Sequence, residues 1–161
     1  MTNVRTVEPV LVRHKDRLLV FSRGGGEAAG RQFISVSDDG GRSWFTELAN
    51  LKPLQPHAAG LAHPFACVDP HQPESLLAVT FERPLPGAAQ LWRGKAATNK
   101  GANFSFAHVR TLVELPKLAG DTHTDFGYAW LLPIEGRRAL VFYYHGQNRG
   151  PCPIWVIATI I

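Results

Sequence analysis

The feature that most constrains the fold of this chain is a repeated pair of apolar strands. Each pair has an apolar strand, a short polar turn and a second apolar strand. The three pairs cover residues 9–12 with 18–21, 64–68 with 76–81, and 128–132 with 139–144. Leu19, Leu77 and Leu140 occupy equivalent places, 58 and 63 residues apart. This repetition predicts an all-β chain built from similar units.

Further apolar stretches extend the units. A third stretch follows each pair, at residues 32–36, 89–92 and 154–158, and a fourth follows in the first two units, at 45–48 and 105–109. Four-stranded antiparallel units repeated every roughly 40 to 60 residues are typical of β-propeller blades. We therefore predict one domain over 1–161, a partial propeller of about three blades, with units at about 8–50, 61–112 and 121–161. The third unit reaches Ile161 without a fourth strand, which predicts that this blade is completed from elsewhere.

Composition fits short strands joined by turns and excludes several classes of partner. The chain has 15 Gly and 12 Pro, and only 19% of its residues are charged. Its net charge of +4 comes from singly scattered basic residues, so no nucleic-acid partner is expected. No stretch approaches the ~20 apolar residues of a membrane span, and no signal peptide is evident. No membrane partner is expected, and the compartment stays open: cytoplasmic as written, with a secreted parent protein as the alternative.

The residues that bind metals in other proteins show no ligand pattern here. Cys67 and Cys152 lie far apart without a C-x-x-C motif, so we expect reduced, buried thiols and neither a disulfide framework nor a zinc site. Asp121 and Asp125 flank His123, and this segment is either a hydrogen-bonded turn or part of a ligand pocket. We predict no metal and no cofactor.

One turn of the first unit carries a recognisable motif. Residues 37–44 read Ser-Asp-Asp-Gly-Gly-Arg-Ser-Trp and match the Asp-box pattern S-x-D-x-G-x-[T/S]-W. In such a hairpin, which begins at Ser37, Gly41 supplies positive φ, Asp39 accepts backbone N–H bonds across the turn, and Trp44 fills the gap between neighbouring blades. A second copy at residues 97–104 has Asn and Phe in place of Asp and Trp.

The repeated units and the Asp box together resemble the sialidase (neuraminidase) and BNR-repeat family, in particular its C-terminal half. The resemblance covers essentially the whole chain and implies a six-bladed propeller with structural Asp boxes on its rim. Asp boxes also occur in propellers that are not enzymes. Two functions therefore stay open: a retaining glycoside hydrolase of the exo-α-sialidase type, and a non-catalytic propeller that binds carbohydrate or protein.

The resemblance implies two catalytic residues. The family's nucleophile is a Tyr on the first strand of a late blade, matched here by Tyr128 in the sequence Gly127-Tyr128. A phenol suits this role because the anomeric carbon of a sialoside bears a carboxylate, which repels Asp or Glu. A Glu on the first strand of an earlier blade accepts the phenolic proton, and Glu8 matches it.

Arginines hold the substrate carboxylate in this family, because a guanidinium group presents paired donors. Arg23 matches one such position, and Arg83 and Asp125 are further candidates for substrate binding. The place expected for another arginine reads Ala88-Ala89, and no segment resembles the blades that supply the acid/base Asp. The implied substrate is an anionic, sialoside-like glycan, and the chain alone is expected to be inactive.

Each candidate also fits a structural role. Glu8 would then cap a strand, Arg23 would be a surface side chain, and Tyr128 a buried aromatic. Three blades in a row leave two apolar sheet faces uncovered. We expect missing N-terminal blades or the second copy of a homodimer to complete the ring, and the four tryptophans, Trp44, Trp92, Trp130 and Trp155, to fill spaces between blades.

Overall fold

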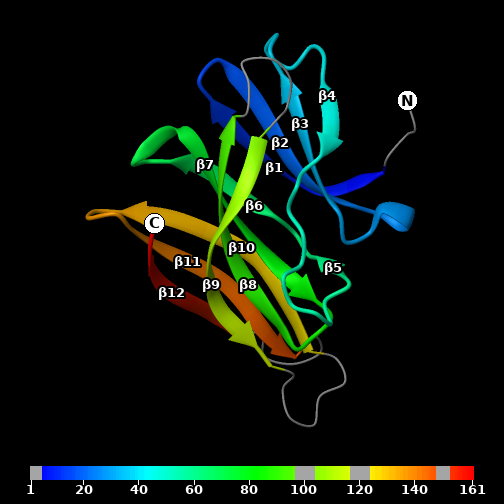
Figure 1. Cartoon of the computed structure of the whole chain (residues 1–161), viewed down its shortest axis with the longest axis vertical. Coiled ribbons are helices and arrows are strands. Elements are labelled where there is room, and N and C mark those ends of the chain that lie inside the picture. The colour runs from blue at the N-terminus through cyan, green and yellow to red at the C-terminus, as the bar shows by residue number, and fades with distance from the viewer. Residues whose placement is uncertain (1–4, 97–103, 117–123, 148–152) are drawn as a thin grey trace.

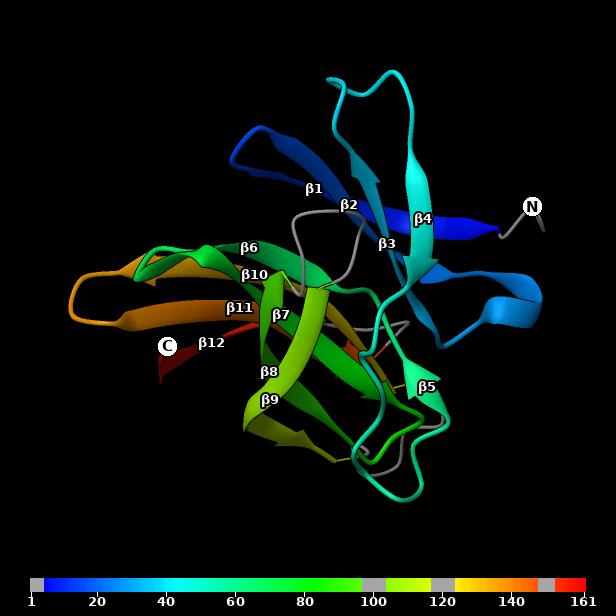
Figure 2. The same ribbon diagram turned by 45° about the horizontal axis from the view of Figure 1, so that its top comes forward.

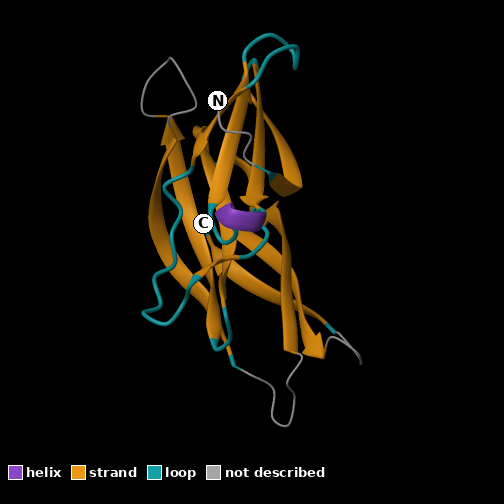
Figure 3. Cartoon of the chain, turned by 90° about the vertical axis from the view of Figure 1, so that its right-hand side faces the viewer, coloured by secondary structure: helices purple, strands orange, loops and turns teal. Residues whose placement is uncertain are grey.

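The computed structural model describes residues 5–96, 104–116, 124–147 and 153–161, and it is all-β. The described residues form one short 3-10 helix, η1 (Gly26–Ala28), and the strands β1 (Thr6–His14), β2 (Arg17–Gly24), β3 (Gln32–Ser37), β4 (Phe45–Leu48), β5 (Gly60–Leu61), β6 (Phe65–Asp69), β7 (Gln72–Arg83), β8 (Gly87–Ala96), β9 (Phe104–Leu115), β10 (Thr124–Ile134), β11 (Arg138–Gln147) and β12 (Ile154–Ile160). Figure 3 shows how far strands dominate the chain. The predicted all-β class is confirmed.

The strands form three antiparallel sheets in chain order (Figure 1). The first sheet has the order β1-β2-β3-β4, and the third has the order β10-β11-β12. In the second sheet β5, β7, β8 and β9 follow one another, and β6 also pairs with β7. Each predicted strand pair is therefore an observed hairpin, although the second sheet continues to Leu115, beyond the predicted boundary at residue 112.

The sheets stack face to face, with one apolar core on each side of the second sheet (Figure 2). One core joins the first sheet to the second and includes Leu19, Phe21 and Trp92. The other joins the second sheet to the third, where Phe81 is fully buried and its ring contacts the rings of Phe126 and Tyr143. Burial of the inner faces thus fixes how the units lie relative to one another.

Two glycines bring the first and second sheets into backbone contact. Gly30 adopts a φ of +82°, and its carbonyl accepts a hydrogen bond from the Leu61 amide at 2.9 Å. A Cβ atom added to Gly60 would lie only 2.6 Å from the Cα of Gly30. Any side chain at Gly60 would therefore push the two sheets apart, so this contact needs glycine.

The face of the third sheet that points away from the second is apolar and exposed. Register places Trp130 beside Phe142 and Phe142 beside Val156 on this face. Its exposed large side chains are Trp130, Leu132, Ile154, Val156 and Ile160. Such a face on a sheet is a candidate contact surface for another protein layer.

No helix in the described ranges is long and apolar enough to cross a membrane.

The prediction that four tryptophans fill spaces between sheets is wrong for Trp44 and Trp155. Trp92 is buried in the core and donates a hydrogen bond to Thr80 at 2.8 Å. Trp44, Trp130 and Trp155 are exposed by 43%, 64% and 50%. The indole of Trp44 packs over Gly41 of its own hairpin, and Trp155 lies on the edge strand β12, where it donates to the His145 carbonyl within the third sheet. The Trp130 ring is exposed but also contacts the ring of Phe65 in the second sheet, with centroids 5.3 Å apart.

Candidate functional site

The candidate site forms where irregularities in two first strands meet. In β1, Glu8 and Pro9 together oppose the single residue Ser22 of β2. In β10, Tyr128 and Ala129 together oppose Tyr143 of β11. Each strand therefore carries a β-bulge, which bends the strand and redirects a side chain.

Both bulges hold a non-glycine residue in the left-handed backbone region. Glu8 has a φ of +55°, and Tyr128 has a φ of +49° directly after Gly127 at +142°. Left-handed conformations are costly for residues with a Cβ, especially for a large aromatic residue. Observed backbone strain of this kind concentrates at functional sites. Four non-glycine residues of the described ranges have positive φ: Lys15 and Arg137 lie in hairpin turns, and Glu8 and Tyr128, which the sequence predicts as catalytic, lie within strands.

The bulges bring Glu8 and Tyr128, 120 residues apart in the chain, into direct contact. The hydroxyl of Tyr128 donates a hydrogen bond to Oε1 of Glu8 at 2.6 Å. Nε of Arg23 donates to the other carboxylate oxygen, Oε2, at 2.7 Å. The Tyr128 side chain is 52% exposed, so its hydroxyl is held by Glu8 and still faces solvent.

This contact sets the charge states of both groups. Burial alone would raise the pKa of Glu8, but hydrogen bonds from Arg23 and Tyr128 and the charge of Arg23 outweigh it and hold the pKa below its ordinary value. The hydrogen bond to Glu8, burial and the Glu8 charge raise the pKa of Tyr128. At neutral pH Glu8 is therefore an ionised acceptor, and Tyr128 keeps its proton.

Arg83 and Asp125 form a second polar group beside the first. Nη2 of Arg83 donates to Oδ1 of Asp125 at 2.9 Å and to the Phe126 carbonyl at 2.8 Å. The hydroxyl of Tyr144 donates to the other oxygen of Asp125 at 2.9 Å. The rings of Tyr144 and Tyr128 lie nearly parallel, with centroids 5.9 Å apart, so the two groups are adjacent.

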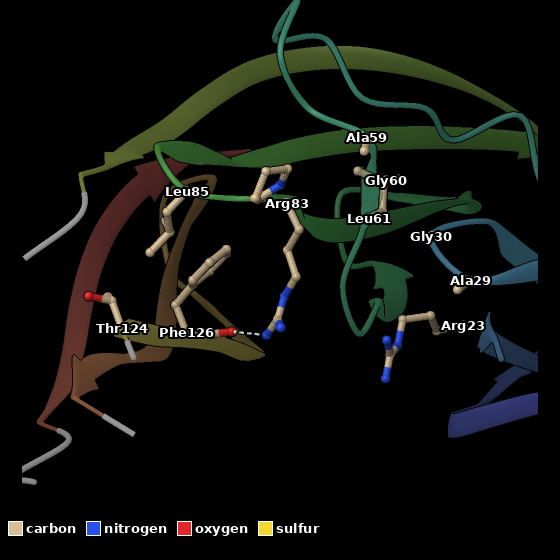
Figure 4. Close-up of a pocket in the computed structure, with 11 residues that line it drawn as sticks. Arg23, Ala29, Gly30, Ala59, Gly60, Leu61, Arg83, Leu85, Thr124 and Phe126 are labelled. Atoms are coloured by element: carbon tan, nitrogen blue, oxygen red, sulfur yellow. Dashed lines mark hydrogen bonds between the residues drawn. The ribbon is translucent and has the colours of Figure 1, made fainter. Parts of the chain in front are cut away.

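A cavity of about 680 Å³ opens beside these groups. Arg23 and Arg83 line it, together with Leu85, Thr124 and Phe126. Figure 4 shows the guanidinium groups of Arg23 and Arg83 extending toward the same side of this space. Arg23, Arg83 and Phe126 also border a small recess that contains Glu8 and Tyr128. A proton acceptor and a hydroxyl group therefore border the recess, and the two cations line both the recess and the larger cavity.

The Asp box lies at the other end of the first sheet and has no part in this site. Ser37 pairs with Leu18 near the β1–β2 turn, whereas Glu8 lies close to Arg23 at the opposite end of β2. Asp39 accepts the amide hydrogens of Arg42 and Ser43, both at 2.9 Å, and the Ser43 hydroxyl at 2.6 Å.

The Asp box hairpin has the backbone geometry that the motif predicts. Ser37 donates its hydroxyl to Asp39 at 2.8 Å and accepts the Gly41 amide at 2.8 Å. Gly41 has a φ of +92°, and the Trp44 indole donates to its carbonyl at 3.0 Å. The hydrogen bonds with Ser43 come first among the causes that lower the pKa of Asp39 to about 2. These contacts close the turn.

Sequence reasoning did not assign two neighbours of Tyr128 to the site. Tyr144 links it to Asp125, and the imidazole of His63 stacks on its ring with centroids 4.7 Å apart. The only sequence signal for His63 is the proline that follows it, as Pro9 follows Glu8. Asp121, His123, Cys152 and most of the second Asp-box copy, residues 97–103, lie outside the described residues.

Comparisons and metal chemistry add little to the site. No protein-family model and no curated protein sequence matches this chain. Within the described ranges, no group of three or more His, Cys, Asp or Glu side chains is arranged to hold a metal ion.

Burial raises the pKa of the half-buried Cys67 thiol to about 12, which leaves it a poor nucleophile at neutral pH.

Proposed function

We propose that the three sheets are consecutive blades of a sialidase-like β-propeller and that this chain carries part of the active site of a retaining exo-α-sialidase. The observation that carries the proposal is the 2.6 Å hydrogen bond from Tyr128 to Glu8, with Arg23 on the other oxygen of the same carboxylate. A nucleophile within hydrogen-bond reach of an oriented base is the general arrangement of covalent catalysis.

In the proposed reaction Tyr128 attacks the anomeric carbon of a terminal sialoside. The phenolic oxygen forms a bond to that carbon, the bond to the leaving group breaks, and the phenolic proton moves to Glu8. The ionised state of Glu8 supports its role as acceptor, because its pKa is lowered although burial opposes the shift. A water molecule then replaces Tyr128 at the same carbon, which retains the stereochemistry.

The cavity supports an anionic sugar as substrate. Arg23 and Arg83 both line it and both keep their charge at any physiological pH. Leu85 and Phe126 supply an apolar wall for the less polar side of the sugar ring. We propose that the substrate carboxylate binds between the two guanidinium groups and that Asp125 orients Arg83 through their 2.9 Å ion pair.

The proposal includes a covering for the exposed face of the third sheet. Further blades, or a second copy of the chain, would bury Trp130, Leu132 and Ile154, and would supply the acid/base Asp that no segment here matches. Hydrolysis of natural glycans is then expected only from the completed propeller. A substrate whose leaving group departs without being protonated does not need the acid/base Asp, so this chain alone can react with it.

A non-catalytic glycan-binding propeller is the second candidate. It is favoured by the ion pairs that Arg23 and Arg83 already form with Glu8 and Asp125, because these pairs compensate the cations without a substrate. In this case the cavity would bind a sialylated glycan, and Tyr128 would not react.

A mechanism-based reagent separates the two candidates. A sialosyl fluoride with a second fluorine on carbon 3 releases fluoride without acid catalysis and slows the second step, so the covalent intermediate accumulates. We expect intact-mass analysis to show one sialosyl adduct and peptide mapping to place it on Tyr128. Tyr128→Phe should abolish the adduct, and Tyr143→Phe, at a buried tyrosine one strand away, should keep it. Saturable glycan binding without any adduct would overturn the catalytic proposal and support the alternative.

A further inference from the structure

The second sheet has a bulge at the position equivalent to Glu8 and Tyr128. Leu61 pairs with Glu82 and Phe65 with Val79, so three residues of the first strand oppose two residues of β7. The amide of Ala62 donates to the carbonyl of Phe81, which leaves His63 and Pro64 opposite Thr80. His63, between β5 and β6, therefore occupies the place in the second sheet that Glu8 and Tyr128 occupy at the bulges of β1 and β10.

Contacts between the sheets bring the three residues together. β6 contacts both β1 and β10. The imidazole of His63 lies 4.7 Å from the Tyr128 ring, centroid to centroid, at an interplanar angle of 25°, which is a stacked geometry. His63, Glu8 and Tyr128 all border the same small recess.

The imidazole contacts Tyr128 through its face. Nδ1 of His63 is buried, yet it has no hydrogen-bond partner among the described residues. Burial lowers the pKa of His63, and the repulsion from Arg23 adds to this effect, although Glu8 opposes it. The ring is therefore neutral at neutral pH. A neutral planar ring against the phenol fixes the ring plane of Tyr128 and adds no positive charge beside Arg23.

Tyr128 needs such support because its side chain is half exposed and its backbone is strained. Its hydroxyl meets Glu8 only if the phenol ring keeps one orientation. We propose that His63 is a positioning residue that holds the phenol of Tyr128, together with Tyr144, so that the hydroxyl stays on the Glu8 carboxylate. This inference rests on the proposed function for its catalytic consequence, but the positioning itself is measurable without any substrate.

Two substitutions at His63 separate ring stacking from space filling. His63→Leu keeps an apolar side chain of similar volume and removes the planar ring, and His63→Phe restores a planar ring without nitrogen. The chain contains 3 Tyr, so ¹³C-tyrosine NMR of the full chain gives few signals, which Tyr→Phe variants assign. The signal of Tyr128 reports its pKa, which its contact with Glu8 raises.

We expect the pKa of Tyr128 to fall toward its ordinary value in His63→Leu and to recover in His63→Phe. The rate of adduct formation with the sialosyl fluoride should follow the same order, with a loss of about tenfold or more in His63→Leu, because misplaced reacting groups react slowly. An unchanged Tyr128 titration in His63→Leu, or a His63→Phe variant that behaves like His63→Leu, would overturn the positioning role. A titration that responds to His63 in a protein that forms no adduct would instead retain the positioning role and reject the proposed function.

Discussion

The Asp-box hairpin and the Glu8–Tyr128 site both centre on a carboxylate held by hydrogen bonds, yet they depend on different parts of the fold. The partners of Asp39 lie within four residues of it. The partners of Glu8 lie 15 and 120 residues away, on another strand and on another sheet. The hairpin can form within one sheet, whereas the site exists only when the sheets stack. Local contacts therefore stabilise the hairpin, and long-range packing of the sheets brings the candidate site together.

Removing a core ring should disrupt the site far more than the hairpin. Phe81→Ala takes a fully buried side chain out of the core between the second and third sheets. We expect a loss of about 3–5 kcal/mol in the free energy of unfolding, as is usual for a buried Phe. Urea denaturation measures this loss, and the Tyr128 NMR signal reports the state of the site.

The exposed Phe45 provides the matched control. It is 57% exposed on β4, and Phe45→Ala should change the free energy of unfolding by no more than about 0.5 kcal/mol. If the Phe81 and Phe45 variants lost equal stability, burial between the sheets would not be what holds the site together.

A methyl group at Gly60 should part the first two sheets by a smaller amount. Its Cβ would lie 2.6 Å from the Cα of Gly30, closer than carbon atoms can approach, so the backbones must move. We expect Gly60→Ala to cost about 1–3 kcal/mol of unfolding free energy and to weaken the contact of Glu8 with Tyr128. Differential scanning calorimetry together with the Tyr128 titration tests both effects.

Gly25→Ala is the control for this substitution. Gly25 has extended backbone, with a φ of −109°, and an added Cβ would make only ordinary contacts at 3.6 Å. This variant should match the wild type in its free energy of unfolding and in the Tyr128 titration. A Gly60→Ala protein as stable as Gly25→Ala would show that the sheets do not need this close approach.

The smallest effect should come from titrating the hairpin. The pKa of Asp39 is lowered from 3.8 to about 2, so its stabilising contribution is fully present above the ordinary value and is lost as the pH falls through about 2. We expect the NMR amide signals of Arg42 and Ser43 to shift with a midpoint near pH 2. Asp39→Asn should remove this titration and leave the Tyr128 signal unchanged. A midpoint near the ordinary Asp value would contradict the role of the hydrogen bonds.

The difference between local and long-range contacts also explains what could be predicted from the sequence. The strand pairs and the Asp box are visible in short segments, because alternation and turn residues act locally. The contact of Glu8 with Tyr128 was expected only through the family resemblance. His63 was missed because its role arises when β6 packs between its neighbours, and the exposure of Trp130 was missed because periodicity does not say which face of a sheet is covered. Pro64 was the one available hint.

The equivalent bulges have a consequence for protein engineering. Glu8 and Tyr128 stand at bulges with positive φ, and His63 stands in the irregular pairing between β5 and β6. Exchanging residues at positions 8, 63 and 128 offers a way to install new triads of side chains on an unchanged scaffold.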